Sequence, residues 1–363
     1  MITKGGVASV KNHAMVAMSG GVDSSVALWL ALQKGFSCQG AYMQMCSAAL
    51  LGKEPGKDAE DAAAVAQRLD IPFSVLDGMD AFISHVAEPF VAAYEAGLTP
   101  NPCIECNKTM KFGLLLEKAL EAGCDTLVTG HYARICQDKE TGRYLLKKAV
   151  DENKDQSYFL ACLNQQQLSH VHLPLGELTK DQVRTIAQQQ GFINARKRDS
   201  QDICFIPDGD HVGFMERYRK KPYPEGDYLD LNGNVVGRHK GAAGYTIGQR
   251  KGLGIALGQP AYVCAKDMEH NTVTLGSNED LFKSALRAKD WNWFPFPVLE
   301  KPIRVLAKVR YRHTPQWATV HPEDNGFARV EFDEPQRAIT AGPAVVLYDG
   351  DTVVGGGTIT EVL

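Results

Sequence analysis

Two groups of residues in this 363-residue chain have the types and spacing that chemistry needs: a Gly- and Ser-rich run and a set of cysteines. The run reads Ser19-Gly20-Gly21-Val22-Asp23-Ser24-Ser25. Its glycines allow a tight turn, so that several backbone N–H groups can converge on an anion at the positive start of a helix. The serine hydroxyls add hydrogen-bond donors, and Asp23 could hold Mg²⁺ among phosphate oxygens. The run therefore predicts a loop that binds phosphate.

The same loop lacks the signatures of two commoner nucleotide-binding motifs. It has neither the lysine of a Walker A loop nor the Gly-x-Gly-x-x-Gly of a dinucleotide-binding fold. This favours a loop that grips pyrophosphate over one that clasps a γ-phosphate. A Gly-rich turn at a helix start is common, but six matched residues between a predicted strand and a predicted helix resemble the PP-loop of N-type ATP pyrophosphatases. Members of that superfamily activate a carbonyl or carboxyl oxygen by adenylation and release pyrophosphate.

Three of the nine cysteines form the second group. Cys103 and Cys106 make a Cys-x-x-Cys, and Cys204 lies in a polar run further along. In a cytosolic chain, grouped cysteines indicate metal or redox chemistry rather than a disulfide framework. Three thiolates would leave one iron of a [4Fe–4S] cluster free to bind sulfide. We expect the other cysteines to be small buried hydrophobes; they are Cys38, Cys46, Cys124, Cys136, Cys162 and Cys264.

The composition limits what these groups can belong to. The 39 Lys and Arg against 43 Asp and Glu give a formal net charge of −4, and hydrophobic residues make up 44%. These values are ordinary for a globular protein of two or three domains. No apolar run approaches the ~20 residues that cross a bilayer, so we expect a cytoplasmic protein with no membrane partner. The mild acidity argues against nonspecific coating of nucleic acid but allows a local basic surface.

The order of predicted elements places both groups on an α/β scaffold. Between residues 13 and 134, short apolar runs alternate with helical stretches, which is typical of βαβ units on a parallel sheet. After about residue 207, Gly, Asp and Asn cluster around alternating runs that indicate β-hairpins. The predicted strands are 14–18, 38–43, 73–76, 126–129, 228–231, 235–238, 262–265, 273–275, 304–312, 328–332, 344–348 and 352–362, and the predicted helices are 24–34, 58–69, 81–96, 112–122 and 182–190. We predict a PP-loop α/β domain over residues 1–207, a small β-rich central domain over 208–278 and a C-terminal β-barrel-like domain over 279–363.

Taken together, the motifs resemble the bacterial tRNA 2-thiouridylase family (MnmA/TrmU), whose members thiolate the wobble uridine of tRNA. The matching runs span almost the whole chain in order: 19–25, 99–108, 129–132, 153–160, 199–206, 248–254 and 310–312. The resemblance implies that ATP adenylates the C2 oxygen of uridine and that a sulfur nucleophile then displaces AMP. It also implies a tRNA-binding C-terminal domain, tRNAs for Lys, Glu and Gln as substrates, and a relay protein or a cysteine desulfurase as sulfur donor.

By the same resemblance, Cys204 carries a persulfide, and Cys106 assists the transfer or resolves it as a disulfide. Many family members have Asp where this chain has Cys103, so the Cys-x-x-Cys is a departure that adds a third thiol. Two mechanisms stay open: a persulfide on Cys204, or sulfide on a [4Fe–4S] cluster held by all three cysteines. We expect Lys108 and Lys111 to favour a thiolate nearby.

The resemblance further assigns contacts to ATP and to tRNA. The implied ATP contacts are Ala17, Met18, Ser19, Gly20, Gly21, Val22, Asp23, Ser24, Met43 and Gly130. The implied tRNA contacts are Asn101, Pro102, Cys103, His131, Lys154, Asp155, Gln156, Arg310 and Tyr311. Basic runs at 196–198 and 217–221 would meet phosphates, as would a strand face that alternation predicts to carry Arg304, Lys308, Arg310 and Arg312. Family members often have Gln where this chain has Pro343, so we assign that position no base contact.

Two other functions are compatible with part of the sequence. One is another PP-loop adenylating enzyme, such as a synthetase that acts on a small carboxylate, but it explains neither the cysteines nor the β-rich domains. The other is an inactive paralogue that binds tRNA or an iron–sulfur cluster. The presence of Asp23, Cys106 and Cys204 argues against loss of activity.

Overall fold

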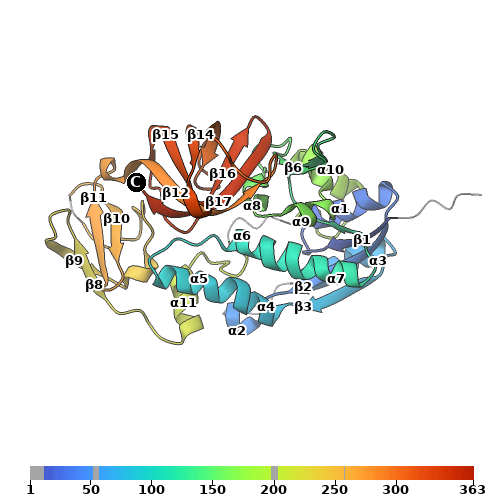
Figure 1. Cartoon of the computed structure of the whole chain (residues 1–363). Coiled ribbons are helices and arrows are strands. Elements are labelled where there is room, and N and C mark those ends of the chain that lie inside the picture. Colours follow the sequence, from blue (N-terminus) through green and yellow to red (C-terminus); the bar gives the residue numbers. More distant parts are fainter. Residues whose placement is uncertain (1–11, 52–56, 198–202, 257) are drawn as a thin grey trace, which may run out of the picture.

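The computed structural model describes residues 12–51, 57–197, 203–256 and 258–363, and Figure 1 shows its arrangement. An α/β domain, a small β domain and a β-barrel follow one another along the chain. The barrel lies over the helices of the α/β domain, and the small β domain occupies one end of the molecule (Figure 1). The predicted class, a parallel-sheet domain followed by two β-rich domains, is confirmed.

The α/β domain is built on a five-stranded sheet with the order β3-β2-β1-β4-β7, in which each pair of neighbours is parallel. Its strands are β1 (His13–Ala17), β2 (Ser37–Gln44), β3 (Phe73–Asp77), β4 (Thr126–Val128) and β7 (Val171–His172). The first four are the predicted strands with shifts of a residue or so at their ends. Parallel strands end at one common edge, which is where open α/β sheets bind ligands.

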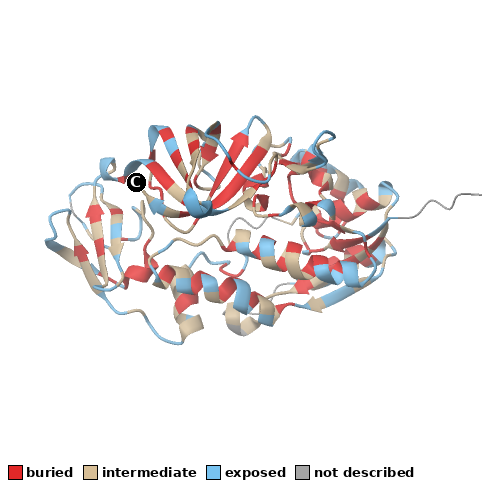
Figure 2. Cartoon of the chain, in the orientation of Figure 1, coloured by how far each residue is buried: buried red, intermediate tan, exposed pale blue. Residues whose placement is uncertain are grey.

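Helices cover both faces of this sheet. They are α1 (Val22–Gln33), α2 (Ala48–Leu51), α3 (Asp58–Arg68), α4 (Met79–Phe82), η1 (Ile83–Ala87), α5 (Glu88–Glu95), α6 (Pro102–Glu105), η2 (Cys106–Leu114), α7 (Leu115–Glu121), α8 (Ser157–Leu160), α9 (Gln165–Ser169), η3 (Pro174–Glu177) and α10 (Lys180–Gln189). Ala14 and Val16 of β1 pack with α1, α3 and α10, whereas Met15 packs with α5, η2 and α7. Strand alternation thus makes two cores, and Figure 2 shows the buried faces. No helix in the described part of the chain is long and apolar enough to span a membrane.

Two of the predicted helices are parts of longer runs. The expected 81–96 segment belongs to a run from α4 through η1 to α5, and the expected 112–122 segment belongs to a run from α6 through η2 to α7. Both η1 and η2 are π-helical, with i→i+5 bonding in place of i→i+4. The second run therefore begins ten residues earlier than predicted and carries the Cys-x-x-Cys at its start.

The two C-terminal domains are β-structures. The central one follows α11 (His211–Arg219) and has the strand order β10-β11-β8-β9; its strands are β8 (Gly226–Leu229), β9 (Val235–His239), β10 (Tyr262–Asp267) and β11 (Thr272–Gly276). The barrel strands are β12 (Phe282–Trp293), β13 (Ile303–Lys308), β14 (Gln316–Pro322), β15 (Ala328–Arg337), β16 (Ala344–Asp349) and β17 (Thr352–Val362). Because β12 pairs with both β15 and β17, the sheet closes on itself. Strands β12 and β14 were not predicted.

One hairpin of the α/β domain belongs to the barrel's sheet. It consists of β5 (Arg134–Gln137) and β6 (Tyr144–Lys147), and Lys147 is paired with Thr352 of β17. Asp351 accepts hydrogen bonds from Arg134 Nη2 at 2.9 Å and from Lys147 Nζ at 3.3 Å. This connection was not predicted, and it holds the first and last domains together (Figure 1).

Candidate active site

The predicted phosphate-binding loop lies between β1 and α1, at the carboxyl edge of the sheet. Ser24 Oγ accepts from Ser19 N at 3.1 Å and donates to Gly21 O at 3.0 Å, and Ser25 Oγ donates to the same carbonyl at 3.1 Å. Gly21 is the residue before α1, and no described side chain caps this helix start. Its backbone N–H groups therefore face the loop, as an anion site requires.

The loop is clamped from outside by residues that follow α10. Asn194 Nδ2 donates to Gly20 O at 3.0 Å and to Ser25 Oγ at 2.9 Å. Lys197 Nζ also donates to Gly20 O, at 3.1 Å, and pairs with Asp58 and Asp61 of α3 at 2.7 and 2.6 Å. Gly20 has φ +70°, and a Cβ there would lie 2.2 Å from the Asp58 carbonyl, so only glycine fits. Lys197 was expected to meet RNA phosphate, but its charge is held by these carboxylates.

The carboxylate of the loop, Asp23, is bonded to two residues that the sequence reading did not assign. Lys180 Nζ, at the start of α10, lies 2.7 and 2.8 Å from the two Asp23 oxygens. Tyr132 Oη donates to Asp23 Oδ1 at 2.7 Å. A Mg²⁺ ion at Asp23 would therefore share this carboxylate with an ammonium group. Lys180 could have been suspected, because a cation in the first turn opposes the helix dipole.

The other implied ATP contacts gather around the loop. Ala17 ends β1, Met18 N donates to Ala41 O of β2 at 2.8 Å, and Met43 is buried near the end of β2. Gly130 follows β4, and a Cβ on it would lie 2.8 Å from Asp23 C and Ser24 N. Residues at or just after the carboxyl ends of three neighbouring strands, β1, β2 and β4, thus lie at the edge of the sheet that carries the loop, and their contact with ATP stays a prediction.

The thiols lie near Lys111, whose ammonium contacts His131, the residue after Gly130. Cys106 is buried at the start of η2, and its Sγ donates to Met45 Sδ at 3.9 Å. Burial raises the pKa of Cys106 to about 11, with smaller rises from Cys204 and Cys103. Cys204 is exposed, in a turn, yet crowding by protein atoms raises the pKa of its thiol too. Cys46, which was interpreted as a buried hydrophobe, is a fourth member of this group: burial and the charges of Cys204 and Cys106 raise its pKa to about 12.

Lys111 is the cation common to the three motif cysteines. Against the larger effect of burial, its charge lowers the pKa of Cys103, Cys106 and Cys204. Lys111 lies five positions after Cys106, the spacing that one i→i+5 hydrogen bond of η2 spans. Lys108 acts on Cys162 instead. The expectation that lysines favour a thiolate holds for Lys111, but desolvation outweighs it.

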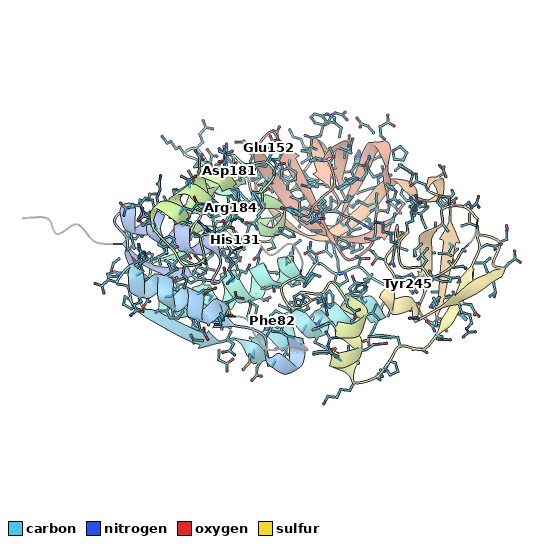
Figure 3. The ribbon with its side chains drawn as sticks, turned by 180° about the vertical axis from the view of Figure 1, so that it is seen from behind. Phe82, His131, Glu152, Asp181, Arg184 and Tyr245 are labelled. Atoms are coloured by element: carbon cyan, nitrogen blue, oxygen red, sulfur yellow. The ribbon has the colours of Figure 1, made fainter. Side chains whose placement is uncertain are left out.

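His131 connects the loop with the thiols. It is buried in the α/β domain, and burial, helped by the charge of Lys111, holds its pKa well below the usual range (Figure 3). Lys111 Nζ lies 3.5 Å from His131 Nε2, which must accept because an ammonium only donates. Nδ1 then carries the proton and donates to Thr129 Oγ1 at 2.8 Å. Two adjacent residues therefore connect the two regions: Gly130 packs against Asp23 of the loop, and His131 contacts Lys111 near the thiols.

The three cysteines do not form a ready metal site. Within the described ranges, which omit 198–202, no three His, Cys, Asp or Glu side chains are grouped so as to hold a metal ion. The charge of Cys204 raises the pKa of Cys103 and of Cys106, so the three thiols lie in one neighbourhood, but as arranged they do not fit a [4Fe–4S] cluster. Of the run 199–206, residues 199–202 lie outside the described residues.

Six of the implied tRNA contacts lie in two places of the α/β domain. Asn101 and Pro102 open α6, next to Cys103, and Asn101 bonds the Tyr158 hydroxyl. Lys154, Asp155 and Gln156 follow one another in a loop. Asp155 accepts hydrogen bonds from Ala149 N at 3.0 Å and from Ser157 Oγ at 2.7 Å, and Gln156 Oε1 accepts one from Tyr132 N at 2.9 Å. The side chains of Asp155 and Gln156 therefore fix the conformation of the protein at this place.

The predicted basic strand face is wrong in its extent. Strand β13 ends at Lys308, and residues 309–312 form a bend and turn. Arg310 is half-buried, and its Nη2 donates to Ile247 O at 3.2 Å and Ala338 O at 2.8 Å, which ties the two β domains together. Tyr311 stacks obliquely on Phe159 with ring centroids 4.3 Å apart. Arg304 pairs with Asp333, and the expected contact of this strand face with RNA phosphates stays a prediction.

The second basic run, 217–221, contains another engaged arginine. Arg219 pairs with Glu88 at 2.8 Å and Glu95 at 2.7 Å, both on α5. Its five N–H donors suit a two-carboxylate partner, and the contact fixes α11 against the α/β domain. Arg219 therefore serves domain packing.

Three family models match consecutive parts of the chain. They are described as a tRNA methyl transferase HUP domain over residues 12–208, a tRNA methyl transferase PRC-barrel domain over 212–277 and an aminomethyltransferase beta-barrel domain over 283–359. The first spans more than half of the 363 residues.

Curated proteins match along nearly their whole length. The chain is 48% identical over 354 residues to a Clostridioides difficile protein, covering 96% of this chain and 98% of that one. It is 49% identical over 355 residues to a Moorella thermoacetica protein, covering 96% and 99%. Both carry the name tRNA-specific 2-thiouridylase MnmA. The chain belongs to the MnmA family.

Solved structures resemble this MnmA family member over about half of its length. One is a 4-thiouridine synthetase in complex with RNA and ATP, with a TM-score of 0.35 and 16% identity, covering 54% of this chain and 45% of that one. Another is the U34-tRNA thiolase NcsA from Methanococcus maripaludis with its [4Fe-4S] cluster, with a TM-score of 0.35 and 17% identity, covering 58% and 71%. Likenesses this partial carry no argument about ligands.

Proposed function

We propose that the chain is an ATP-dependent tRNA 2-thiouridylase that acts on the wobble uridine. One observation carries the proposal: Gly130 packs against Asp23 of the phosphate-binding loop while the next residue, His131, contacts Lys111 beside the thiols. A nucleotide at the loop and a sulfur nucleophile at the cysteines would then approach one substrate carbon. Family membership supports ATP as co-substrate and tRNA as substrate. The descriptions of two of the family models mention methyl transfer. A site with several thiols suits sulfur transfer better than methyl transfer.

In the first step, the uridine C2 oxygen attacks the α-phosphorus of ATP, N3 gives up its proton, and pyrophosphate leaves. The proposed nucleotide contacts are Ala17, Met18, Ser19, Gly20, Gly21, Val22, Asp23, Ser24, Met43 and Gly130. Carbonyl oxygen is a poor leaving group, and adenylation makes it leave as AMP. The Ser19–Ser25 loop holds phosphate without reorganising, because its side chains are already bonded to the protein. Mg²⁺ would bind chiefly to the phosphate oxygens.

In the second step, the terminal sulfur of a Cys204 persulfide attacks C2 and AMP leaves. The Cys106 thiolate then attacks Cys204 Sγ, the S–S bond breaks, and its electron pair stays with the sulfur on C2. N3 regains a proton, and the products are 2-thiouridine and a Cys106–Cys204 disulfide. An external thiol reductant supplies two electrons to restore the thiols, and an external persulfide donor, a relay protein or a cysteine desulfurase, reloads Cys204. The exposure of Cys204 suits this delivery.

We propose that tRNA, with Lys, Glu and Gln acceptors, lies across the face formed by the start of α6 and the barrel. Asn101, Pro102 and Cys103 would border the target base, with His131, Lys154, Asp155, Gln156, Arg310 and Tyr311 around them. Asp155, Gln156 and Arg310 would act by shaping this face, because their side chains are bonded within the protein. Extraction of the stacked base costs a few kcal/mol, which a large contact surface offsets.

The test is thiolation in vitro. The full chain is incubated with ATP, a persulfide donor, a thiol reductant and unmodified tRNA, and the nucleosides are analysed by mass spectrometry. We expect 2-thiouridine from wild type and from Cys136→Ser, since Cys136 is an exposed cysteine on β5, outside the site. We expect none from Cys204→Ser. Product from Cys204→Ser, or no product from wild type, would contradict the proposal.

A further inference from the structure

Cys46 is a thiol next to the catalytic cysteines to which the proposed mechanism gives no role. It lies in the short connection from β2 to α2. Cys46 is half-buried, whereas Cys106 is buried and Cys204 is exposed. The three thiols therefore differ stepwise in their exposure, and Cys46 is the intermediate one.

The chain on both sides of Cys46 is held in place. Met45, the residue before it, accepts a hydrogen bond at its Sδ from Cys106 Sγ, at 3.9 Å. After it, Leu50 N donates to Ser47 Oγ at 3.3 Å and Leu51 N donates to Ser47 O at 3.0 Å, which begins α2. Cys46 is thus one residue away from the contact that the buried thiol makes.

The same stretch borders the segment that carries Cys204. Cys46 packs in the larger core together with Ile203 and Phe205, the two neighbours of Cys204. Helix α2 packs on α11, the helix that follows Cys204 in the sequence (Figure 1). In agreement with this placement, the charges of Cys204 and, to a lesser degree, of Cys106 add to burial in raising the pKa of Cys46. Cys46 is therefore a neighbour of both catalytic thiols.

The disulfide that the proposed turnover leaves is difficult to reach from solvent. Thiol–disulfide exchange needs a thiolate to approach one of the two sulfur atoms. Cys106 is only 7% exposed, so an external thiol would meet this disulfide at Cys204. A thiol that is already in the pocket needs no such access, because it reacts at a high effective concentration.

The acidities of the two partners favour exchange toward Cys46. Burial raises the pKa of Cys106 to about 11, and burial with the neighbouring thiols raises that of Cys46 to about 12. The thiol of lower pKa is the better leaving group from a disulfide. Cys106 therefore leaves Cys204 more readily than Cys46 does.

We infer that Cys46 takes over the turnover disulfide from Cys106 by thiol–disulfide exchange, an inference that rests on the proposed function. Cys46 gives up its proton, its thiolate attacks Cys204 Sγ, and the bond between Cys204 Sγ and Cys106 Sγ breaks. The electron pair of that bond goes to Cys106, which takes up a proton, so the exchange itself consumes no oxidant or reductant. The external thiol reductant of the proposed mechanism then opens the Cys46–Cys204 disulfide with two electrons. Cys106 is thereby restored to its place beside Met45 before the reductant acts.

The experiment follows one turnover of the full chain under anaerobic conditions and without reductant. Cys204 is loaded with persulfide, the donor is removed, and ATP and unmodified tRNA are added. After an acid quench, free thiols are blocked with N-ethylmaleimide and the disulfides are mapped by tandem mass spectrometry. We expect a Cys46–Cys204 disulfide in proportion to the 2-thiouridine formed, with Cys106 blocked as a free thiol. The same incubation without tRNA should give no Cys46 disulfide.

Cys46→Ser supplies the kinetic test. We expect its first round of 2-thiouridine formation to stay within about twofold of wild type, because the thiols of that round are intact. Its steady-state rate with a thiol reductant should fall at least about threefold, because reduction then depends on the Cys106–Cys204 disulfide. Cys162→Ser is the matched control: it removes another half-buried cysteine of the same domain, near the Ile104 and Phe159 carbonyls, and both rates should stay within about twofold.

The outcomes separate the inference from the function on which it rests. A turnover disulfide of Cys204 with any cysteine other than Cys46 overturns the inference alone, and so does a Cys46 disulfide that forms equally without tRNA. An equal loss of the first round and of the steady-state rate in Cys46→Ser assigns Cys46 a structural role and overturns it too. Wild type that forms no 2-thiouridine refutes the proposed function, and the inference with it.

Discussion

In the phosphate-binding loop the polar side chains are bonded to protein partners, whereas Cys106, the buried thiol of the neighbouring region, is surrounded mainly by apolar residues. Ser24, Ser25 and Asp23 each have hydrogen bonds of 3.1 Å or less. Cys106 has Met45 Sδ as its partner, and it packs among the buried residues of the larger core. One region is prepared by hydrogen bonds and the other by desolvation.

The difference teaches what each region needs in order to work. A prebuilt loop binds an anion at little reorganisation cost, because its donors are already aimed. Desolvation instead raises the pKa of each thiol, so the site opposes a bare thiolate and depends on Lys111 to offset part of that effect. A persulfide ionises more readily than a thiol, so delivery of sulfur as Cys204 persulfide suits such a pocket.

The largest expected effect concerns the thiol region. Cys106→Ser removes the nucleophile proposed to release sulfur from Cys204, so 2-thiouridine formation should fall at least about 100-fold. The measurement is nucleoside mass spectrometry of tRNA after reaction with the full chain. Cys162→Ser, a cysteine of the same domain whose Sγ lies near the Ile104 and Phe159 carbonyls, should retain most activity. Comparable activity of Cys106→Ser and Cys162→Ser would remove Cys106 from the mechanism.

Next in size is the cation of the thiol region. Lys111→Met removes the charge that lowers the pKa of three thiols, so their pKa values should rise further and iodoacetamide should alkylate them more slowly at pH 8, by up to about tenfold per pKa unit. Lys108→Met, three residues earlier on η2, is the control and should leave these rates unchanged. Equal slowing in both variants would mean that η2 was disturbed.

A smaller effect concerns the clamp on the loop. Asn194→Ala removes hydrogen bonds to Gly20 O and Ser25 Oγ in a buried place, so the free energy of unfolding should fall by about 1–3 kcal/mol. Urea unfolding followed by circular dichroism measures it. Asn153→Ala, at an exposed position of the α/β domain, should change it by less than about 0.5 kcal/mol. If Asn194→Ala were equally mild, the loop would not depend on that clamp.

The smallest expected effect concerns a buried lysine outside the candidate active site, whose pKa is lowered by loss of solvent. In the central domain, burial lowers the pKa of Lys266 to about 8. Between pH 8 and the unfolded pKa of 10.5, the unfolded chain binds a proton that the folded chain does not, so the free energy of unfolding should rise with pH. Lys266→Met lacks this contribution. The melting temperature of wild type minus that of Lys266→Met should therefore increase from pH 7.5 to 10; a flat difference would show that Lys266 is not desolvated.

The sequence predicted the loop better than the thiol region for a physical reason. Residues 19–25 make most of the loop by themselves, so local chemistry sufficed, and βαβ alternation placed them at the sheet edge. Lys180, Asn194 and Cys46 come from distant segments, and only the fold brings them near Asp23, Gly20 and Cys106. The alternation of polar and apolar residues predicted the barrel strand β17 correctly, but it predicted that β13 continues past Lys308. The strand ends there, and Arg310 donates to carbonyls of the two β domains instead of lying on a strand face.

The β5–β6 hairpin has a consequence for the order in which the chain is made. Lys147 pairs with Thr352, which a ribosome adds 205 residues later. At about 5–20 residues per second, the hairpin waits roughly 10–40 seconds for β17. Throughout that time β6 has an open strand edge, and Arg134 and Lys147 lack the carboxylate of Asp351. The hairpin of the α/β domain therefore completes its strand pairing only after β17 of the barrel has been made.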